Sequence, residues 1–596
     1  MAPRFLLVAG TAGFVLLAAA CSNTSPRETS MPPAPVPSES AAPASAAADA
    51  AATAAIEVQS NKTLGRRDEA LAKRSAQPVM AEQRAYLGGM AAPSFMPPPS
   101  PPSSMAMPAE DRERYGDISS NPVQRVSEAP VSTFSIDVDT GAYANVRRFL
   151  QQGQLPPTDA VRVEELVNYF DYTYPVPREA GTPFSVITEM APTPWNAKTH
   201  LLHVGVQGFK PQGPRPASNL VFLVDVSGSM SDADKLPLVK SSLKLLTKEL
   251  GKNDRISLVV YAGSTGVILE PTPGDQRARI NAAIDQLGAG GSTNGAAGID
   301  LAYAMAQQGY IKNGVNRVLL ATDGDFNVGV SSFEHLVEIV EEKRKSGVAL
   351  TTLGFGQGNY NEQLMEQLAD HGNGNYAYID SLSEAQKVLV RQRDATLQTI
   401  ARDVKIQIEF NPAQVAEYRL IGYENRLLKR EDFANDKIDA GEIGAGHRVT
   451  ALYEVALVGD GGERIQPLRY GQPRAIGKPA GEIAHLRLRY KRPADGMSAA
   501  SHLIERPLMR SDVATRLDAT SEAFRLSAAV AAFGQLLRGG QYTEGFDYTR
   551  VRELARAARG ADANGEAGEF LRLVDLAKGL TQPAETAHTD DISVTP

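Results

Sequence analysis

The sequence predicts an α/β protein whose central domain is a doubly wound, mostly parallel β-sheet. Residues 219–226 and 316–322 are short apolar runs that end in small polar residues, which is typical of strands buried on both faces of a sheet. A helix-like repeat of apolar residues follows the first run, and strand-like and helix-like runs then alternate up to residue 392. Such alternation favours a parallel sheet with helices on both faces.

The elements of this domain follow from the pattern in chain order. The expected strands are 219–226, 255–261, 266–270, 316–322, 348–355 and 375–379. The expected helices are 234–250, 276–287, 294–308, 332–346, 361–370 and 383–392. Because Pro271 and Pro273 follow the run 266–270, and proline is tolerated at sheet edges, we expect this strand to be the antiparallel edge.

Oxygen-bearing side chains follow the predicted central strands. Asp225, Ser227 and Ser229 lie where the first strand ends, and Asp323 follows the strand 316–322. Thr293 lies in a glycine-rich loop that opens a predicted helix. Ligand sites in open α/β sheets are built at the carboxyl ends of strands. Hard oxygen donors of this kind suit Mg²⁺, Mn²⁺ or Ca²⁺.

The ordered set Asp225, Ser227, Ser229, Thr293 and Asp323 resembles the von Willebrand factor type A (VWA) domain with an intact metal-ion-dependent adhesion site. The resemblance implies a Rossmann-like domain over residues 216–392. It also implies that the two serine hydroxyls bind the metal directly, that Thr293 binds directly or through water, and that the two aspartates hold coordinated waters. Ser and Asp also cap helices and turn loops, which is the alternative for each residue taken singly.

The resemblance also implies a binding mode. A site with few direct anionic ligands keeps a coordination position open, and the Glu or Asp carboxylate of a protein partner can fill it. Asp325, Phe326 and Asn327 follow the second metal-site aspartate and are placed to line the rim of such a site.

The amino terminus predicts an exported and lipid-anchored protein. Arg4, a short apolar run and small residues up to position 20 are typical of a secretory signal peptide, and a transmembrane helix needs about 20 apolar residues. Cys21 is the chain's single cysteine, and the segment before it resembles a bacterial lipobox, although Ala18 stands at the usual leucine position. An ordinary cleavage site is the alternative. By resemblance to lipoprotein sorting, Ser22 favours the outer membrane of a Gram-negative envelope.

The regions that flank the central domain have different compositions. Residues 21–123 are rich in Pro, Ala, Ser and Met, which predicts a disordered tether. Residues 124–215 predict a module of helices followed by strands, and 393–495 predict further strands, so we expect a β-sandwich interrupted by the VWA domain. Residues 496–582 predict a helical region and 583–596 a disordered tail. A glycine-rich turn at 459–462 predicts a hairpin.

Two further features of these regions are a pair of aspartates and a resemblance of the flanking blocks to a protein family. Asp137 and Asp139 are either metal ligands or turn-forming residues at a strand end, and the second interpretation is favoured. The blocks 134–140 and 162–170, together with the carboxyl-terminal region, resemble a family of bacterial VWA-domain lipoproteins.

Composition and motifs exclude several function classes. A net charge of −8 argues against nonspecific nucleic-acid binding. The sequence contains no G-x-S-x-G, Walker A or H-E-x-x-H motif, so a metal-dependent hydrolase is the weakest hypothesis and we expect no enzyme. Metal-dependent binding of a protein partner is the leading hypothesis. A structural or assembly factor, in which the metal mainly stabilises the domain, is the second.

Overall fold

A computed structural model of the protein describes residues 112–177, 181–292, 295–325, 333–466, 469, 481–495 and 499–582. The predicted signal peptide, Cys21, the tether up to residue 111 and the predicted tail 583–596 lie outside the described residues. None of the helices in these described ranges is long and apolar enough to cross a membrane.

The central α/β domain contains a six-stranded sheet in the order β10-β9-β8-β5-β6-β7. Its strands are β5 (Ser218–Asp225), β6 (Arg255–Tyr261), β7 (Thr265–Pro273), β8 (Val315–Thr322), β9 (Ala349–Phe355) and β10 (Tyr376–Ile379). All neighbouring pairs are parallel except β6 and β7, which confirms the predicted antiparallel edge. Strands β5 and β8 are neighbours, so Asp225, the last residue of β5, and Asp323, which follows β8, lie close together.

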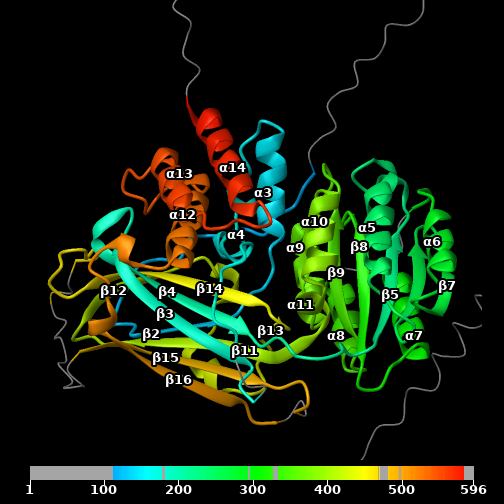
Figure 1. Ribbon diagram of the computed structural model, residues 1–596, viewed down its shortest axis with the longest axis horizontal. Coiled ribbons are helices and arrows are strands. Elements are labelled where there is room, and N and C mark those ends of the chain that lie inside the picture. The colour runs from blue at the N-terminus through cyan, green and yellow to red at the C-terminus, as the bar shows by residue number, and fades with distance from the viewer. Residues whose placement is uncertain are drawn as a thin grey trace, which may run out of the picture. The chain divides into compact units, whose positions relative to one another are not determined.

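Helices cover both faces of this sheet (Figure 1). Buried side chains on one face pack against α5 (Leu236–Lys248), α6 (Arg277–Asp285) and α10 (Leu382–Gln386). The other face packs against α7 (Gly295–Gln308), α8 (Phe333–Arg344) and α9 (Glu362–His371). The last predicted helix, 383–392, is interrupted: α10 continues into a π-helical turn, η3 (Lys387–Arg391), which precedes α11 (Arg393–Leu397).

The flanking regions form one β-sandwich. Its first sheet has the order β1-β12-β14-β4-β3, with β1 (Gln124–Arg125), β3 (Phe184–Thr193), β4 (Asn196–Gly208), β12 (Val415–Ile421) and β14 (Arg448–Leu457). The second contains β13 (Gly441–Gly444), β11 (Thr399–Phe410), β15 (Glu482–Lys491) and β16 (His502–Met509), with β2 (Val131–Ser135) also on β11. Apolar side chains from both sheets share one buried core.

The α/β domain is inserted between β4 and β11 of this sandwich, as the sequence predicts. The segment that enters the α/β domain after β4 and the segment that leaves it before β11 contact the same turn. Gly446 N–H donates to Phe209 O at 3.0 Å, and Ala445 N–H donates to Gln398 O at 2.8 Å. The entry and exit of the domain are therefore close together in space.

Three predictions about the flanking regions are wrong. Strands β14 and β15 belong to different sheets, so the turn at 459–462 does not close a hairpin between them. The region 496–582, which we predict to be helical, contains strand β16. This segment is a strand because it pairs along β15. Residues 112–123, predicted as tether, pack on the folded part: Arg114 N–H donates to Tyr360 O at 2.8 Å, and the Asn121 amide donates to Gly422 O at 2.7 Å.

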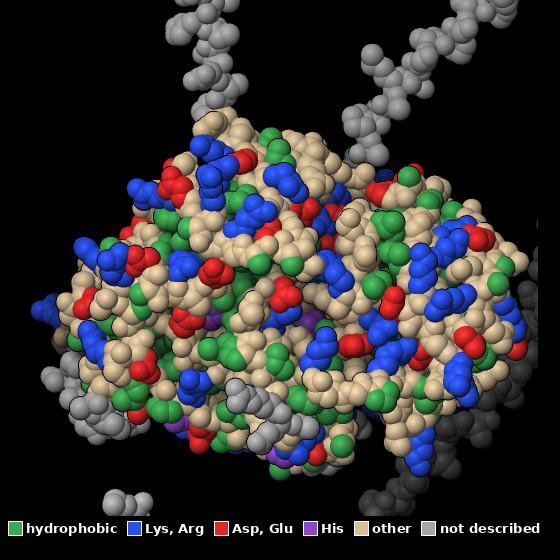
Figure 2. All heavy atoms as spheres, viewed as in Figure 1, with side chains coloured by type: hydrophobic (Ala, Val, Ile, Leu, Met, Phe, Trp, Pro, Cys, Tyr) green, Lys and Arg blue, Asp and Glu red, His purple; other side chains and the backbone are tan. Residues whose placement is uncertain are grey.

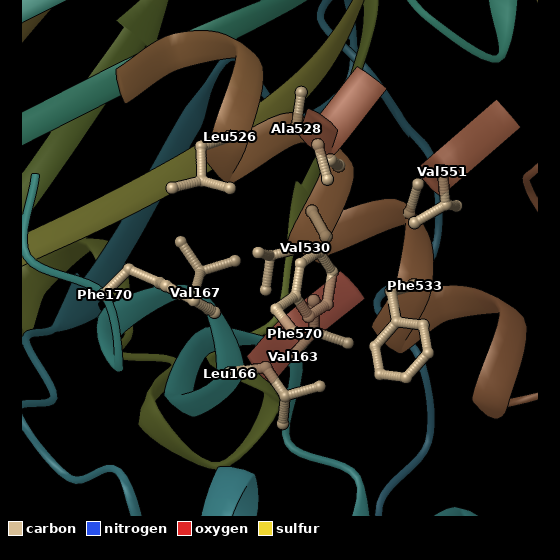
Figure 3. Close-up of a cluster of buried hydrophobic side chains, with 14 of the residues drawn as sticks. Val163, Leu166, Val167, Phe170, Leu526, Ala528, Val530, Phe533, Val551 and Phe570 are labelled. Atoms are coloured by element: carbon tan, nitrogen blue, oxygen red, sulfur yellow. The ribbon is translucent and has the colours of Figure 1, made fainter. Parts of the chain in front are cut away.

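A layer of helices covers the outer face of the first sheet. It contains α3 (Gly141–Gln151), α4 (Val163–Asn168), α12 (Glu522–Leu537), α13 (Tyr548–Ala557) and α14 (Glu566–Thr581). Figure 3 shows Val163 and Leu166 of α4 in one buried apolar cluster with Val530 and Phe533 of α12. The apolar carboxyl-terminal stretch is therefore part of a core that it shares with the amino-terminal module. Trp195, at the β3–β4 turn, is 5% exposed and lies against Phe546, which makes it a packing residue.

Buried charges line the contact between the α/β domain and the rest of the folded chain. Arg426 forms ion pairs with Asp137 and Asp139 at 3.5 Å, with Glu366 at 3.1 Å and with Asp370. Asp139 N–H donates to Asp137 Oδ1 at 3.0 Å, and Asp139 Oδ1 accepts from Tyr376 N–H at 2.8 Å. These two aspartates form a turn and join β10, in agreement with the favoured interpretation.

Arginine side chains from the helical layer extend this network. Arg162 pairs with Glu366 at 2.7 Å, and Arg147 pairs with Asp380 at 2.5 Å and Glu384 at 2.7 Å. The helical layer and the α/β domain are thus joined by paired charges and by a buried apolar cluster that contains Ala144 of α3 and Tyr376 and Tyr378 of β10.

The buried carboxylate of Glu164 is expected to make the free energy of unfolding depend on pH. Burial raises the pKa of Glu164 from its ordinary value of 4.5 to about 8, and Glu424 and Asp137 add to the increase. Because the folded-state pKa lies above the unfolded one, this group lowers the free energy of unfolding as the pH rises from about 4.5 to about 8. We expect Glu164→Gln to exceed the wild type in stability by a margin that grows with pH, reaching on the order of 3 kcal/mol at about pH 8.5.

Urea denaturation of both proteins at about pH 5 and about pH 8.5 measures this margin. Glu338→Gln is the control, because that side chain is 75% exposed. A margin that is the same at both pH values contradicts the assignment.

The surface carries both signs of charge. Figure 2 shows Lys and Arg side chains interspersed with Asp and Glu over the visible face, without a large region of one sign. This face offers no basic stripe of the kind that tracks a nucleic-acid backbone.

Candidate metal centre

The candidate metal centre begins at the carboxyl end of β5. Asp225 is fully buried, and its two oxygens accept hydrogen bonds from Ser227 N–H and the Thr322 hydroxyl, both at 2.8 Å. The first bond holds the loop in a turn, and a short 3₁₀ helix, Gly228–Ser231, follows. The carboxylate thus fixes the loop that presents the two serines.

The serine hydroxyls are spaced as neighbouring ligands of one cation. Ser227 Oγ and Ser229 Oγ lie 3.0 Å apart and are hydrogen-bonded to each other. Two adjacent oxygens on an octahedral ion with metal–oxygen distances of about 2.0–2.1 Å are separated by about 2.9 Å. The separation therefore fits Mg²⁺ or an ion of similar size.

The second carboxylate follows β8. Asp323 is fully buried, and its Oδ1 accepts from Asp325 N–H at 3.1 Å. Gly324 between them has φ +77°, and a Cβ there would lie 3.0 Å from Asn361 N, so glycine fits this turn best.

The electrostatics of the two aspartates favour a bound cation. Burial raises the pKa of Asp225 from its ordinary value of 3.8 to about 6; the charge of Asp323 adds to the increase, and hydrogen bonds from Ser227 and Thr322 oppose it. Two buried carboxylates near each other destabilise the folded state, and a divalent cation relieves that cost.

The loop that carries Thr293 is joined to the same place. Gly228 N–H donates to Gly291 O at 3.1 Å, and Gly290 N–H donates to Val226 O at 2.8 Å. Thr293 itself lies outside the described residues, as do Phe326 and Asn327 of the predicted rim. Asp325 is described and half-buried.

The donor set fits a hard divalent cation. In the described part of the chain no three His, Cys, Asp or Glu side chains gather as metal ligands, and the oxygens here are two hydroxyls backed by two carboxylates. Ser227 and Ser229 would hold the ion, and Asp225 and Asp323 would hold its waters. The chemistry supplied is that of an electrophile for a carboxylate, which Mg²⁺, Mn²⁺ or Ca²⁺ provides.

Two residues of the site are missing from the sequence-based set. Lys235 Nζ lies 3.1 Å from Asp323 Oδ2, and the Asn359 amide donates to the same oxygen at 3.0 Å. Lys235 follows Asp225 at the start of a predicted helix, and Asn359 ends a glycine-rich turn after the strand 348–355. Strand-end position is the signal that could have indicated Asn359, but nothing in the sequence directs Lys235 inward.

The fold and the site define a protein built on a von Willebrand factor type A domain. The family model described as "von Willebrand factor type A domain" matches residues 219–392, and a model described as "von Willebrand factor" matches 109–203. A third model, "Uncharacterized protein YfbK, C-terminal", matches residues 395–580.

The chain belongs to the family of the uncharacterized protein YfbK of Escherichia coli. The two are 50% identical over 477 residues, which cover 78% of this chain and 81% of YfbK. A more distant similarity, 30% identity over 194 residues, joins it to inter-alpha-trypsin inhibitor heavy chain H3 of Pongo abelii, with 30% of this chain and 22% of that protein covered.

Solved structures with a similar fold include a von Willebrand factor type A protein from Catenulispora acidiphila, with 14% identity and a TM-score of 0.37. It matches 67% of this chain and 91% of its own. The ArnB paralog VWA2 from Sulfolobus acidocaldarius is 17% identical with a TM-score of 0.32, over 67% of this chain and 98% of its own.

Proposed function

We propose that this chain is a lipid-anchored protein of the bacterial cell envelope that binds a protein partner through a divalent cation. Asp225, Ser227, Ser229, Thr293 and Asp323 form the site, and the partner supplies a Glu or Asp carboxylate. The observation that carries the proposal is the pair of serine hydroxyls 3.0 Å apart, held by a buried carboxylate.

The chemistry of the site favours binding of an anion. Both proposed direct ligands that the structure describes are neutral hydroxyls, so the ion keeps most of its positive charge. Mg²⁺ prefers six oxygens and seldom takes all of them from the protein that holds it. A carboxylate of a partner supplies one of the remaining oxygens, and Asp325, Phe326 and Asn327 contribute the rim that selects the partner.

The proposed location rests on the sequence of the amino terminus. Lipidation of Cys21, with acyl chains in the outer membrane, holds the folded part in the periplasm at the end of the tether. More than one acyl chain gives stable anchoring, whereas one chain gives only marginal binding.

Catalysis is not part of this proposal. His203 is 2% exposed, and its ring nitrogens form hydrogen bonds with Tyr174 and Ser527 in the core. A structural or assembly role, in which the cation mainly stabilises the domain, is the second candidate, and the two buried carboxylates of the site favour it. In the binding role the partner contacts the cation, and in the structural role it does not.

Affinity capture from detergent-solubilised envelope tests the proposal. The baits are the full chain with Mg²⁺, the full chain with EDTA, and Ser229→Ala with Mg²⁺. We expect one partner to be retained by the first bait and to fall at least tenfold with the other two. Ser241→Ala is the matched control, because Ser241 is exposed on α5 and its hydroxyl donates within the helix to Pro237 O.

Retention of the same proteins by all baits contradicts metal-dependent recognition. If Mg²⁺ raises the melting temperature but leaves capture unchanged, the structural role replaces the binding role.

A further inference from the structure

A lysine side chain is built into the candidate metal centre. Lys235 precedes α5 and is 3% exposed. Its ammonium lies 3.1 Å from Asp323 Oδ2 and donates to Asn359 Oδ1 at 2.7 Å. Lysine is almost never fully buried unless its charge is paired. The pairing here is with a carboxylate of the metal site.

The turn after β9 holds this lysine in place. Gly356 has φ +78°, and a Cβ at that position would lie 2.4 Å from side-chain carbons of Lys235. The backbone of this turn therefore lies directly against the lysine stem. Three residues further on, the Asn359 amide contacts the Lys235 ammonium, Asp323 and Asp325.

Charge counting shows what the lysine changes. Three carboxylates meet in this network, those of Asp225, Asp323 and Asp325, and among the described residues Lys235 is the cation hydrogen-bonded to it. The four groups together carry two negative charges, which a divalent ion balances. Without the lysine the loaded site would remain negative and would repel an incoming carboxylate.

We propose that Lys235 sets the specificity of the site for an anionic ligand by weakening cation binding and strengthening carboxylate binding to the loaded ion. This inference rests on the proposed metal site. It names Lys235 as the residue that sets the balance between the affinity for the cation and the affinity of the loaded ion for a carboxylate. The ammonium repels the divalent ion and neutralises one carboxylate, so the ion attracts the partner's carboxylate more strongly.

The test replaces the lysine and measures both affinities on the full chain. Lys235→Met keeps the stem that packs beside Gly356 and removes the charge, and Lys235→Gln is a second neutral variant. Lys248→Met removes the same charge from an exposed position at the end of α5 and is the matched control. Titration calorimetry gives the Mg²⁺ affinity, and line broadening of ¹³C-acetate by the Mn²⁺-loaded protein reports carboxylate binding. Circular dichroism checks that each variant is folded.

We expect the neutral variants to bind Mg²⁺ about tenfold more tightly and acetate at least fivefold more weakly, with the control unchanged. Any other pattern in a folded neutral variant overturns the inference. In particular, loss of Mg²⁺ binding would mean that the lysine only holds Asp323 in place. If the wild type itself binds no divalent cation, the proposed function fails. If the wild type binds Mg²⁺ and the neutral variants bind Mg²⁺ and acetate with unchanged affinities, only the inference about Lys235 fails.

Discussion

Replacing Arg426 by methionine is expected to lower the free energy of unfolding of the folded chain by about 4 kcal/mol. The Arg426 side chain is 12% exposed, and its guanidinium lies against Asp137 and Asp139 from the amino-terminal module and against Glu366 and Asp370 from α9. Removing one partner of a buried ion pair leaves the other charge without compensation, which costs about 3–5 kcal/mol.

The surrounding carboxylates make this cost large. Burial already raises the pKa of Asp370 to about 6, against the opposing effect of Arg426. Once the arginine is removed, we expect the carboxylates to take up protons, so the loss of stability should be smaller at about pH 5 than at about pH 8. The same residues join the α/β domain to the rest of the chain, so their contact should loosen first.

Chemical denaturation of the full chain measures this effect, and limited proteolysis reports where the chain opens. Arg516→Met is the matched control because the ion pair between Arg516 and Asp518 is exposed, and such pairs contribute little to stability. A loss below about 1 kcal/mol for Arg426→Met would show that the acidic residues are held by other contacts.

Replacing Asp225 by asparagine is expected to have two opposite effects. In EDTA at about pH 7.5 the variant should be more stable than the wild type by about 1 kcal/mol. The raised pKa of Asp225, about 6, contributes about 3 kcal/mol to this difference. Asparagine has one acceptor oxygen for the two donors Ser227 N–H and the Thr322 hydroxyl, and the lost hydrogen bond costs about 1–3 kcal/mol. The sign follows from linkage: the folded-state pKa exceeds the ordinary value of 3.8, so the wild type loses this stability as the pH rises from about 3.8 to about 6. Asparagine carries no charge and loses none.

With Mg²⁺ present the order should reverse. An ion that binds the folded state stabilises it in proportion to the logarithm of its concentration over its dissociation constant. We expect the variant to bind Mg²⁺ at least 100-fold more weakly and to gain no stability from it.

Denaturation curves with Mg²⁺ and with EDTA give both effects. Asp285→Asn is the control, because Asp285 is 59% exposed and pairs with Lys244 at the surface. A variant that Mg²⁺ still stabilises as it does the wild type would remove Asp225 from the site.

The sequence alone predicted the central domain and most residues of the candidate metal centre. Buried parallel strands require continuous apolar runs, and the runs at 219–226 and 316–322 correspond to β5 and β8 with shifts of one residue. Because the ends of such strands meet at one edge of the sheet, the order of Asp225, Ser227, Ser229 and Asp323 was enough to predict that they converge. The edge position of β7 followed in the same way from its prolines.

The tertiary structure alone decided the contacts between distant segments. A lysine before a helix is typical of a solvated position, and only the turn at Gly356 directs Lys235 to Asp323. Arg426 and Asp137 are far apart in the chain, and each by itself has the sequence pattern of an exposed residue. Strand β16 and residues 112–123 have little apolar periodicity of their own and are ordered by backbone hydrogen bonds to partners. Local patterns report burial and propensity, whereas charge pairing and sheet edges depend on which surfaces the folded chain brings together.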